Sequence, residues 1–454
     1  MRKPKASMIA TVSAAMLLAL AAASPVQGKA KQLRFIRDAE VENIIRAYAT
    51  PLFHAAGLNP QAIDVYLVND SRLNAFVLPG LNMFIHTGLL MRAEDPLQLI
   101  GVIAHETGHL AAGHTATRHE NIRRSTQGVI ASYVFGLAAA LASGRPELGQ
   151  AVIAGGQDIA LKNLLKYTRS QESAADQAAI RLLNGTGQSP RGLLEFLRIL
   201  GGQEVLLLSN QDPYLRSHPL TQDRVTFLEQ QVRESPYGEA PANPGFVALH
   251  ARMRAKLTGF LLPMEQVLRR YPESDHSLPA RYARAIALYR KSDLAGALAL
   301  TEALIAEHPD DPYFRELKGQ MLFENGRLAE ALPAYRDAVG LLPESPQLRL
   351  ALAQLLIELN DPVLNQKALG NLAETLRQEP SNAFAWRLSA IAYGRRGDVG
   401  LTALALAEAA LARGRAGEAR QQAVRAQKIL AEHSAGWLRA GDIEKAATRM
   451  AKRQ

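Results

Sequence analysis

Two histidines and a glutamate in residues 101–114 (GVIAHETGHLAAGH) form the pattern His-Glu-x-x-His. His105 and His109 are four positions apart in a segment without proline, so on a helix they share one face, about 6 Å apart along the axis. Two imidazoles at this spacing can bind one tetrahedral Zn²⁺, while Glu106 stands beside the remaining coordination position as a general base. The pattern predicts a zinc metallopeptidase with one zinc ion per chain.

Zinc needs at least one further protein ligand, and the residues next to the motif do not supply it. A metzincin would carry a glycine and a histidine at the positions that Ala112 and Thr115 hold here. The better candidate is Glu172 in the later stretch RSQESAAD, within a predicted helix over residues 161–184. The chain has no cysteine, so a cysteine-ligated metal site is excluded and histidine and carboxylate ligands remain.

Asp176 follows Glu172 by about one helical turn. Its carboxylate can accept a hydrogen bond from the far nitrogen of His105 or His109 and so fix the orientation of that ring. Taken alone, the two carboxylates are more typical of a solvated helix face. The upstream motif is what favours a metal ligand at Glu172 and an orienting residue at Asp176.

The elements around the motif indicate a domain that mixes helices and strands. Short runs of β-branched, aromatic and aliphatic residues predict strands at residues 63–68, 75–78 and 83–86, with a turn at Pro79-Gly80 between the last two. An apolar stretch predicts a helix over residues 97–115 that carries the zinc motif. This order predicts an α+β zincin-like metallopeptidase domain over residues 30–235.

A stretch rich in proline and glycine, ESPYGEAPANPG, predicts a linker at residues 236–246. Beyond it, residues 247–454 predict an all-α tetratricopeptide solenoid, because small residues and prolines recur at a constant offset of 34 residues. In this pattern Ala285, Ala297 and Pro309 recur as Gly319, Ala331 and Pro343. An ordinary alanine-rich helical bundle is the alternative. Tetratricopeptide solenoids present concave surfaces that bind extended segments or partner proteins.

Residues 1–23 predict a signal peptide. Three basic residues within the first five precede a mostly apolar run over residues 8–23, which ends in the small-residue pattern Ala-x-Ala. Cleavage after export would place the protein in the periplasm, and an uncleaved membrane anchor is the alternative. Because the chain has no cysteine, an exported form would use neither disulfides nor a lipid attached to cysteine.

The formal charge of +9 falls to +6 without the three basic residues of the predicted signal peptide. Arginine is spread along the chain without a lysine-rich tail or interleaved aromatic residues, so the pattern argues against nucleic-acid binding. The charge allows peripheral contact with an anionic membrane or lipopolysaccharide surface, although a solvated basic surface also accounts for it.

Two apolar stretches, residues 129–142 and 148–161, are each too short to span a bilayer. They predict buried core helices. A membrane-touching hairpin or a lid over the active site is the alternative.

Together these motifs resemble one known family. HETGH followed by E-x-x-x-D on a later helix is similar to the gluzincin family of the CAAX prenyl-protein endopeptidases and their soluble bacterial relatives. Residues 74–90, NAFVLPGLNMFIHTGLL, also resemble the strand pair that precedes the zinc helix in that family. The combination with a signal peptide and C-terminal repeats resembles periplasmic members that act on outer-membrane proteins. Members embedded in membranes carry several full spans, which this sequence lacks.

The resemblance implies a zinc site with the protein ligands His105, His109 and Glu172. It also implies Glu106 as the general base and Asp176 behind the ligands. Substrate is expected to lie as an added strand along the predicted strand pair. The edge that would bind it consists of Asn74, Ala75, Phe76 and Val77.

The resemblance further implies a role for residues 217–224, SHPLTQDR. In a similar periplasmic protease, a histidine in a matching S-H-P-L segment can occupy the open zinc position and keep the enzyme inactive. His218 fits that place, as an additional zinc ligand in the resting enzyme. The alternatives are that His218 stabilises the oxyanion formed during hydrolysis or that it belongs to a structural His-Pro turn.

The predicted function is therefore that of a periplasmic zinc endopeptidase in quality control or assembly of outer-membrane proteins. Its repeats would contact the β-barrel assembly machinery or an unfolded or stalled client. The client class comes from the resemblance, since the motifs themselves predict only a peptidase with a binding solenoid. A chaperone or scaffold that works mainly through its repeats, with proteolysis held off by His218, is the alternative.

Overall fold

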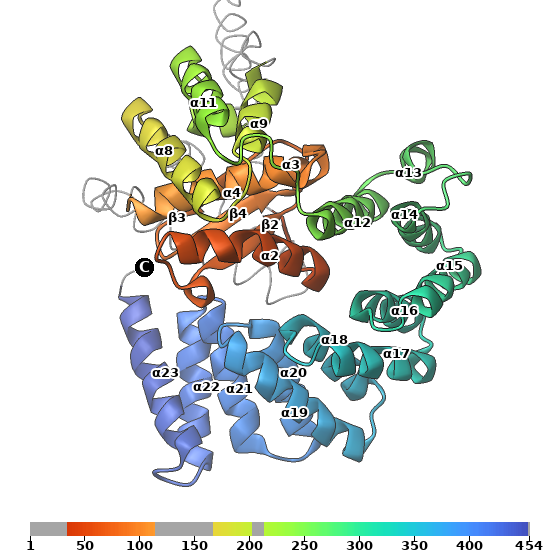
Figure 1. The fold of residues 1–454 in the computed structure, drawn as a ribbon. Helices are drawn as coiled ribbons and strands as arrows, with labels where there is room; N and C mark the ends of the chain where they lie inside the picture. Colours follow the sequence, from red (N-terminus) through yellow and green to blue (C-terminus); the bar gives the residue numbers. More distant parts are fainter. Residues whose placement is uncertain (1–33, 114–166, 202–212, 453–454) are drawn as a thin grey trace, which may run out of the picture. The chain divides into compact units, whose positions relative to one another are not determined.

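The computed structural model describes residues 34–113, 167–201 and 213–452. The predicted signal peptide and the two apolar stretches at residues 129–142 and 148–161 lie outside these ranges. Within them, an N-terminal part combines helices with one small sheet, and an array of paired helices follows (Figure 1). The predicted fold class, an α+β domain followed by tetratricopeptide-type helices, is confirmed.

The sheet contains four strands in the order β1-β2-β4-β3, with the bounds Phe35–Ile36 (β1), Asp64–Val68 (β2), Ala75–Leu78 (β3) and Asn82–His86 (β4). β2 and β4 are parallel, whereas β3 and β4 form an antiparallel hairpin. Gly80 in the hairpin turn has φ 89°, a left-handed conformation that favours glycine. The three predicted strands are confirmed to within one residue, and β3 forms one edge of the sheet.

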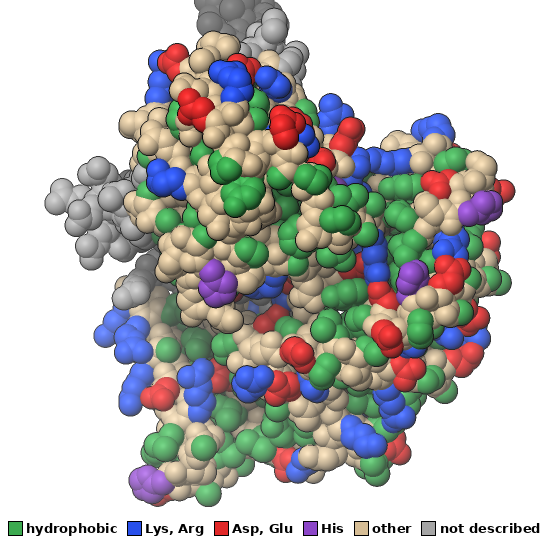
Figure 2. Space-filling view, viewed as in Figure 1, with side chains coloured by type: hydrophobic (Ala, Val, Ile, Leu, Met, Phe, Trp, Pro, Cys, Tyr) green, Lys and Arg blue, Asp and Glu red, His purple; other side chains and the backbone are tan. Residues whose placement is uncertain are grey.

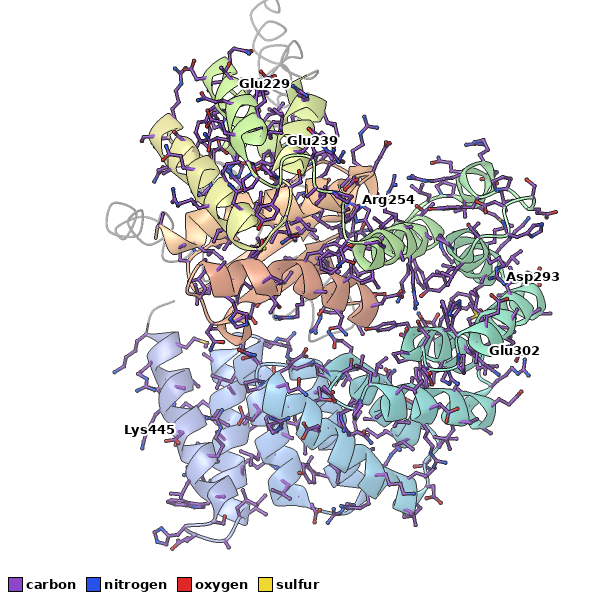
Figure 3. The ribbon with its side chains drawn as sticks, viewed as in Figure 1. Glu229, Glu239, Arg254, Asp293, Glu302 and Lys445 are labelled. Atoms are coloured by element: carbon purple, nitrogen blue, oxygen red, sulfur yellow. The ribbon has the colours of Figure 1, made fainter. Side chains whose placement is uncertain are left out.

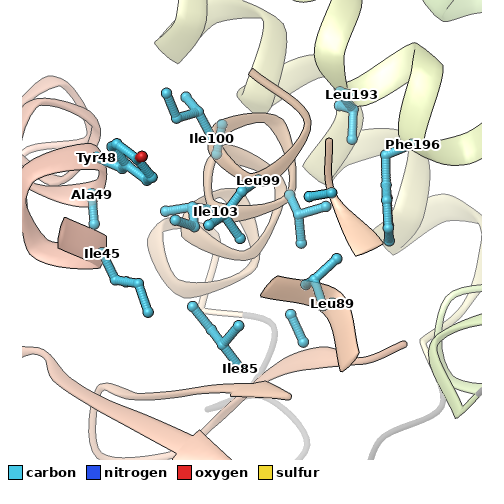
Figure 4. Close-up of a cluster of buried hydrophobic side chains, with 14 of the residues drawn as sticks. Ile45, Tyr48, Ala49, Ile85, Leu89, Leu99, Ile100, Ile103, Leu193 and Phe196 are labelled. Atoms are coloured by element: carbon cyan, nitrogen blue, oxygen red, sulfur yellow. The ribbon is translucent and has the colours of Figure 1, made fainter. Parts of the chain in front are cut away.

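The helices next to the sheet form a common apolar core with it. α2 (Ala39–Ala55), α3 (Thr87–Arg92) and α4 (Pro96–Ala111) contact the strands, while α8 (Arg169–Gly185) and α9 (Arg191–Gly201) pack against α4. Figure 4 shows this core, in which Ile45, Ile85, Ile103 and Phe196 come from α2, β4, α4 and α9. The shorter elements of this region are η1 (Pro60–Ala62), α10 (Pro213–Ser217) and α11 (Gln222–Glu234).

The repeat array consists of helices that pack in antiparallel succession. Its elements are α12 (Pro244–Leu261), α13 (Met264–Arg270), α14 (Leu278–Arg290), α15 (Leu294–Glu307), α16 (Pro312–Glu324), α17 (Leu328–Leu341), α18 (Pro346–Glu358), α19 (Pro362–Gln378), α20 (Ala383–Arg395), α21 (Val399–Ala412), α22 (Ala416–Ile429) and α23 (Ala435–Ala451). The small residues of the 34-residue pattern lie where helices touch. A Cβ on Gly319 of α16, for example, would lie 2.9 Å from the ring of Tyr335 in α17.

α12 connects the array to the α+β part. Its Met253 and Leu257 belong to the same buried cluster as the strands. On α12, Lys256 Nζ lies 3.2 Å from Glu40 Oε2 of α2, and Glu40 also accepts a hydrogen bond of 2.8 Å from Tyr282 of α14. Since α12 packs on both parts, the division at residues 236–246 stays a prediction.

The outer surface carries charges of both signs. In the part of the chain that the structure describes, no helix is long and apolar enough to cross a membrane. Lys and Arg side chains are interspersed with Asp and Glu on the face shown in Figure 2. Glu229 of α11 and Lys445 of α23 point away from their helices in Figure 3. Mixed charges of this kind are typical of a solvated surface.

Candidate metal centre

α4 places the His-Glu-x-x-His motif in the interior of the α+β part. The Asp95 side chain caps the first turn of this helix, and the helix ends at Ala111, because Gly113 has φ 62°. The predicted end at residue 115 is therefore too late. The residues of the motif, His105, Glu106 and His109, are fully buried.

A close approach of α4 and α8 brings the second half of the site to the motif. A Cβ added to Gly108 of α4 would lie 2.9 Å from the carbonyl oxygen of Ala175 and 3.0 Å from the Cβ of Ala178. A larger side chain would push the two helices apart. Gly108 therefore sets how near the α8 carboxylates lie to the histidines.

α8 begins later than the sequence predicts. Thr168 is extended and caps the helix, because its side chain accepts a hydrogen bond from the N–H of Gln171 while the Gln171 side chain accepts one from the Thr168 N–H. The predicted start at residue 161 is thus wrong at Tyr167 and Thr168, which are not helical. Glu172 and Asp176 on α8 are both fully buried, so they do not form a solvated helix face.

His218 comes to the site from the segment after α10. Its backbone N–H donates to the carbonyl of Tyr214 at 2.7 Å, and its ring stacks on the Tyr214 ring at a centroid distance of 4.3 Å. Only 1% of His218 is exposed. The structure therefore brings this sequence-predicted histidine into the same buried space as the α4 and α8 side chains.

Four side chains direct donor atoms at one point. His105 Nε2 lies 3.2 Å from His109 Nε2 and 3.4 Å from His218 Nδ1. Glu172 Oε1 lies 3.3 Å from His109 Nε2 and 3.0 Å from His218 Nδ1. Ligands bound to tetrahedral zinc at about 2.0–2.1 Å are separated from one another by about 3.3 Å. The four side chains therefore fit a single metal ion of this size.

Glu106 lies beside this cluster and contributes no donor atom to it. Its Oε1 is 3.5 Å from His218 Nε2, on the side of the His218 ring that faces away from the other donors. Burial raises the pKa of Glu106 to about 7, against the lowering effect of His218 and His105. A carboxylate that titrates near neutral pH is suited to accept a proton and return it.

Asp176 orients one histidine of the pair. His105 Nδ1 lies 2.9 Å from Asp176 Oδ1, which leaves His105 Nε2 directed at the cluster. Burial opposes ionisation of Asp176, but the hydrogen bond with His105 and the charge of Arg224 keep its pKa below the ordinary value. Of the two histidines that the sequence offered as partners for Asp176, the structure selects His105.

Sequence reasoning missed three residues of the site. Arg224, at the start of α11, is only 5% exposed and forms ion pairs with Glu172 and Asp176. Tyr167 stacks on His109 at a centroid distance of 3.8 Å, and Tyr214 stacks on His218. The signal for Arg224 was its place in the first turn after S-H-P-L, but an arginine there is ordinarily a surface residue.

The predicted substrate edge, Asn74 to Val77, lies on β3 next to the cluster. The Asn74 carbonyl accepts from His86 N–H on β4, so the carbonyls of Leu73 and Val77 belong to the outer side of β3 by strand alternation. The Leu73 carbonyl accepts from the N–H of Tyr214 at 3.3 Å, and the Val77 carbonyl from the hydroxyl of Tyr167 at 3.5 Å. The outer edge of β3 is therefore covered by the same residues that stack on His218 and His109.

Comparison with known proteins gives two family matches. Residues 36–232 match a model described as Peptidase family M48, and residues 282–348 match a model described as Tetratricopeptide repeat. The first match contains every residue of the cluster. The second lies within the array of paired helices.

Whole-length relatives share both parts. The Beta-barrel assembly-enhancing protease of Yersinia pestis is 25% identical over 345 residues, which cover 73% of this chain and 68% of that protein. The protein of the same name from Escherichia coli (strain K12) is 24% identical over 357 residues, covering 75% and 72%. The Mitochondrial metalloendopeptidase OMA1 of Arabidopsis thaliana is 30% identical over 187 residues, covering 39% and 33%.

Proposed function

Because the chain carries a metallopeptidase domain of family M48 followed by tetratricopeptide repeats, we propose that it is a periplasmic zinc endopeptidase acting in quality control or assembly of outer-membrane proteins. The observation that best supports zinc is the tetrahedral spacing of the donor atoms of His105, His109, Glu172 and His218. The name of the relatives supports the client class. A cleaved signal peptide at residues 1–23 would account for export.

Each site residue has a distinct task in this proposal. His105, His109 and Glu172 would hold the zinc ion, which when bound supplies Lewis-acid activation of a water and of the peptide carbonyl. Glu106 accepts the proton of the attacking water and then delivers it to the leaving amine. Asp176 keeps the His105 ring in the orientation that presents Nε2.

An extended client would bind along the outer edge of β3, through backbone hydrogen bonds to residues 74–77. Such binding favours unfolded or stalled proteins, since a folded protein rarely presents a free extended segment. The edge runs beside the metal cluster, because Tyr167 contacts both Val77 and His109. The repeats would then bind the client or the β-barrel assembly machinery.

His218 would hold the resting enzyme inactive. Its Nδ1 takes the fourth corner of the donor set, and its Nε2 lies against Glu106, so one ring blocks both the entry of water and the general base. The adjoining Tyr214 occupies the Leu73 carbonyl at the substrate edge. Hydrolysis then requires the segment with Tyr214 and His218 to move away as substrate binds.

The purified protein is expected to contain one zinc ion per chain, because three ligands from two packed helices present a preformed site. Metal analysis of the isolated protein measures this directly. His105→Ala should lower the zinc content to a small fraction of that value, while His250→Ala, which removes a buried histidine outside the cluster, should leave it unchanged. A chain that binds no zinc with all three ligands intact would contradict the proposed cofactor.

A chaperone or scaffold is the second candidate function, and the complete burial of the cluster favours it. With His105, Glu106 and His218 inaccessible, the resting protein would work through its repeats, with proteolysis secondary. Both functions make the same demand on the repeats. They differ in whether Glu106 is needed.

A deletion strain separates the two functions. Glu106→Gln removes the general base and keeps the fold, so the proteolytic function predicts that this variant fails to restore the outer-membrane barrier, measured by sensitivity to a large antibiotic. The wild-type chain should restore it fully. If Glu106→Gln restores the barrier as well as the wild type does, proteolysis is dispensable and the chaperone function stands.

A further inference from the structure

Arg224 is a buried cation whose guanidinium nitrogens all contact named groups. Nε and Nη2 donate to the two carboxylate oxygens of Asp176 at 2.6 and 2.9 Å. Nη1 lies 2.7 Å from Glu172 Oε2 and donates to the carbonyl of Pro219 at 3.0 Å. Buried arginines require this degree of pairing, because an unpaired charge in the interior is strongly destabilising. The arrangement connects the start of α11 to both carboxylates of α8.

We infer that Arg224 is a positioning residue for the metal centre, acting through Glu172 and Asp176 on the geometry of the donor set. The inference rests on the proposed zinc site. It assigns to Arg224 a task that neither the zinc motif nor the residues of S-H-P-L perform.

One part of this task is the orientation of Glu172. The contact of Arg224 with Oε2 leaves Oε1 as the oxygen that lies nearest to His218 Nδ1 and His109 Nε2. Without the arginine, the carboxylate could rotate and present either oxygen or both. Arg224 therefore favours coordination through a single oxygen in a fixed place.

The other part is the orientation of His105. The two parallel hydrogen bonds from Arg224 fix the plane of the Asp176 carboxylate, and its Oδ1 lies 2.9 Å from His105 Nδ1. Lysine cannot reproduce this fork, because an ammonium group is a point charge without a planar pair of donors. The chain of contacts from Arg224 through Asp176 thus ends on a metal ligand.

The charges of the site also balance around Arg224. The carboxylates of Glu106, Glu172 and Asp176 supply three negative charges, all fully buried. Arg224 and a divalent ion supply three positive charges, so the loaded site is neutral when His218 is neutral. Loss of the arginine would leave one uncompensated negative charge in the interior.

The test compares zinc affinity between Arg224→Lys and the wild type. Competition with a chromophoric chelator should show zinc binding weakened by about 10- to 100-fold, the usual effect of removing a group that orients metal ligands. The visible absorption of Co²⁺ bound in place of zinc should shift, because the donor geometry changes. The matched control is Arg233→Lys, at an exposed position in the last turn of the same helix, which should change neither measurement.

Two further arms keep the test decisive. Repeating it with His218→Ala in both chains separates positioning from closure, since the loss of affinity should persist when the closing histidine is absent. If Arg224→Lys fails to fold, the double variant Arg224→Gln with Asp176→Asn removes one charge of each sign and should show the same loss.

Wild-type zinc affinity and an unchanged Co²⁺ spectrum in a folded Arg224 variant would overturn the inference. Failure of the wild-type chain itself to bind zinc would instead overturn the proposed function.

Discussion

Replacing His218 by alanine is expected to raise the rate at which the purified protein hydrolyses an unfolded substrate such as casein. Alanine offers no donor at the fourth corner and no contact with Glu106, so the open state becomes the resting state. A minor open state populated at about 0.1–10% would give an increase of about 10- to 1,000-fold. Initial rates with fluorescently labelled casein, at equal zinc content, measure the effect.

The matched control for this change is His54→Ala, which removes an exposed histidine of α2. Its rate should equal that of the wild type. A His218→Ala chain that keeps its zinc but loses activity would favour the alternative in which His218 stabilises the oxyanion. An unchanged rate would leave His218 as part of a structural turn.

Replacing Glu106 by glutamine in the His218→Ala chain should abolish most of the gained activity, by about 10²- to 10⁴-fold, because glutamine cannot accept the proton of the attacking water. The open chain is the better background, since the wild-type rate is expected to be low. Zinc content should not change, because Glu106 contributes no atom to the donor set. Steady-state rates and metal analysis are measured on the same preparation.

Glu273→Gln, at an exposed position between α13 and α14, is the control for the loss of one carboxylate. It should leave the rate of the open chain unchanged. A Glu106→Gln chain that retains its activity with zinc bound would show that another group serves as the base. Loss of zinc together with activity would instead place Glu106 in the metal-binding set.

The local part of the fold and site could be read from the sequence. His105, Glu106 and His109 lie on one helix because their spacing matches the helical repeat, and Glu172 and Asp176 likewise share a face of α8. The strands at β2, β3 and β4 have the predicted bounds to within one residue, because alternation and a glycine turn are local signals. The 34-residue repetition likewise depends on neighbouring segments only.

The rest depends on tertiary approach, which one sequence does not encode locally. Nothing around Arg224 indicates that two carboxylates 48 and 52 residues earlier will pair with it. The two tyrosines that stack on the histidines are equally distant from the motif. The start of α8 was missed for a different reason, since the capping pair of Thr168 and Gln171 was present but the apolar residues before it suggested a longer helix.

The covered edge of β3 has a consequence beyond the reaction. A strand with exposed backbone groups on one side is a template for pairing with any extended chain, including a second copy of itself. Tyr214 and Tyr167 occupy two of its outward carbonyls in the closed protein. The closing segment therefore also guards the protein against self-association. Variants that remain open would be the ones to form aggregates as their concentration rises.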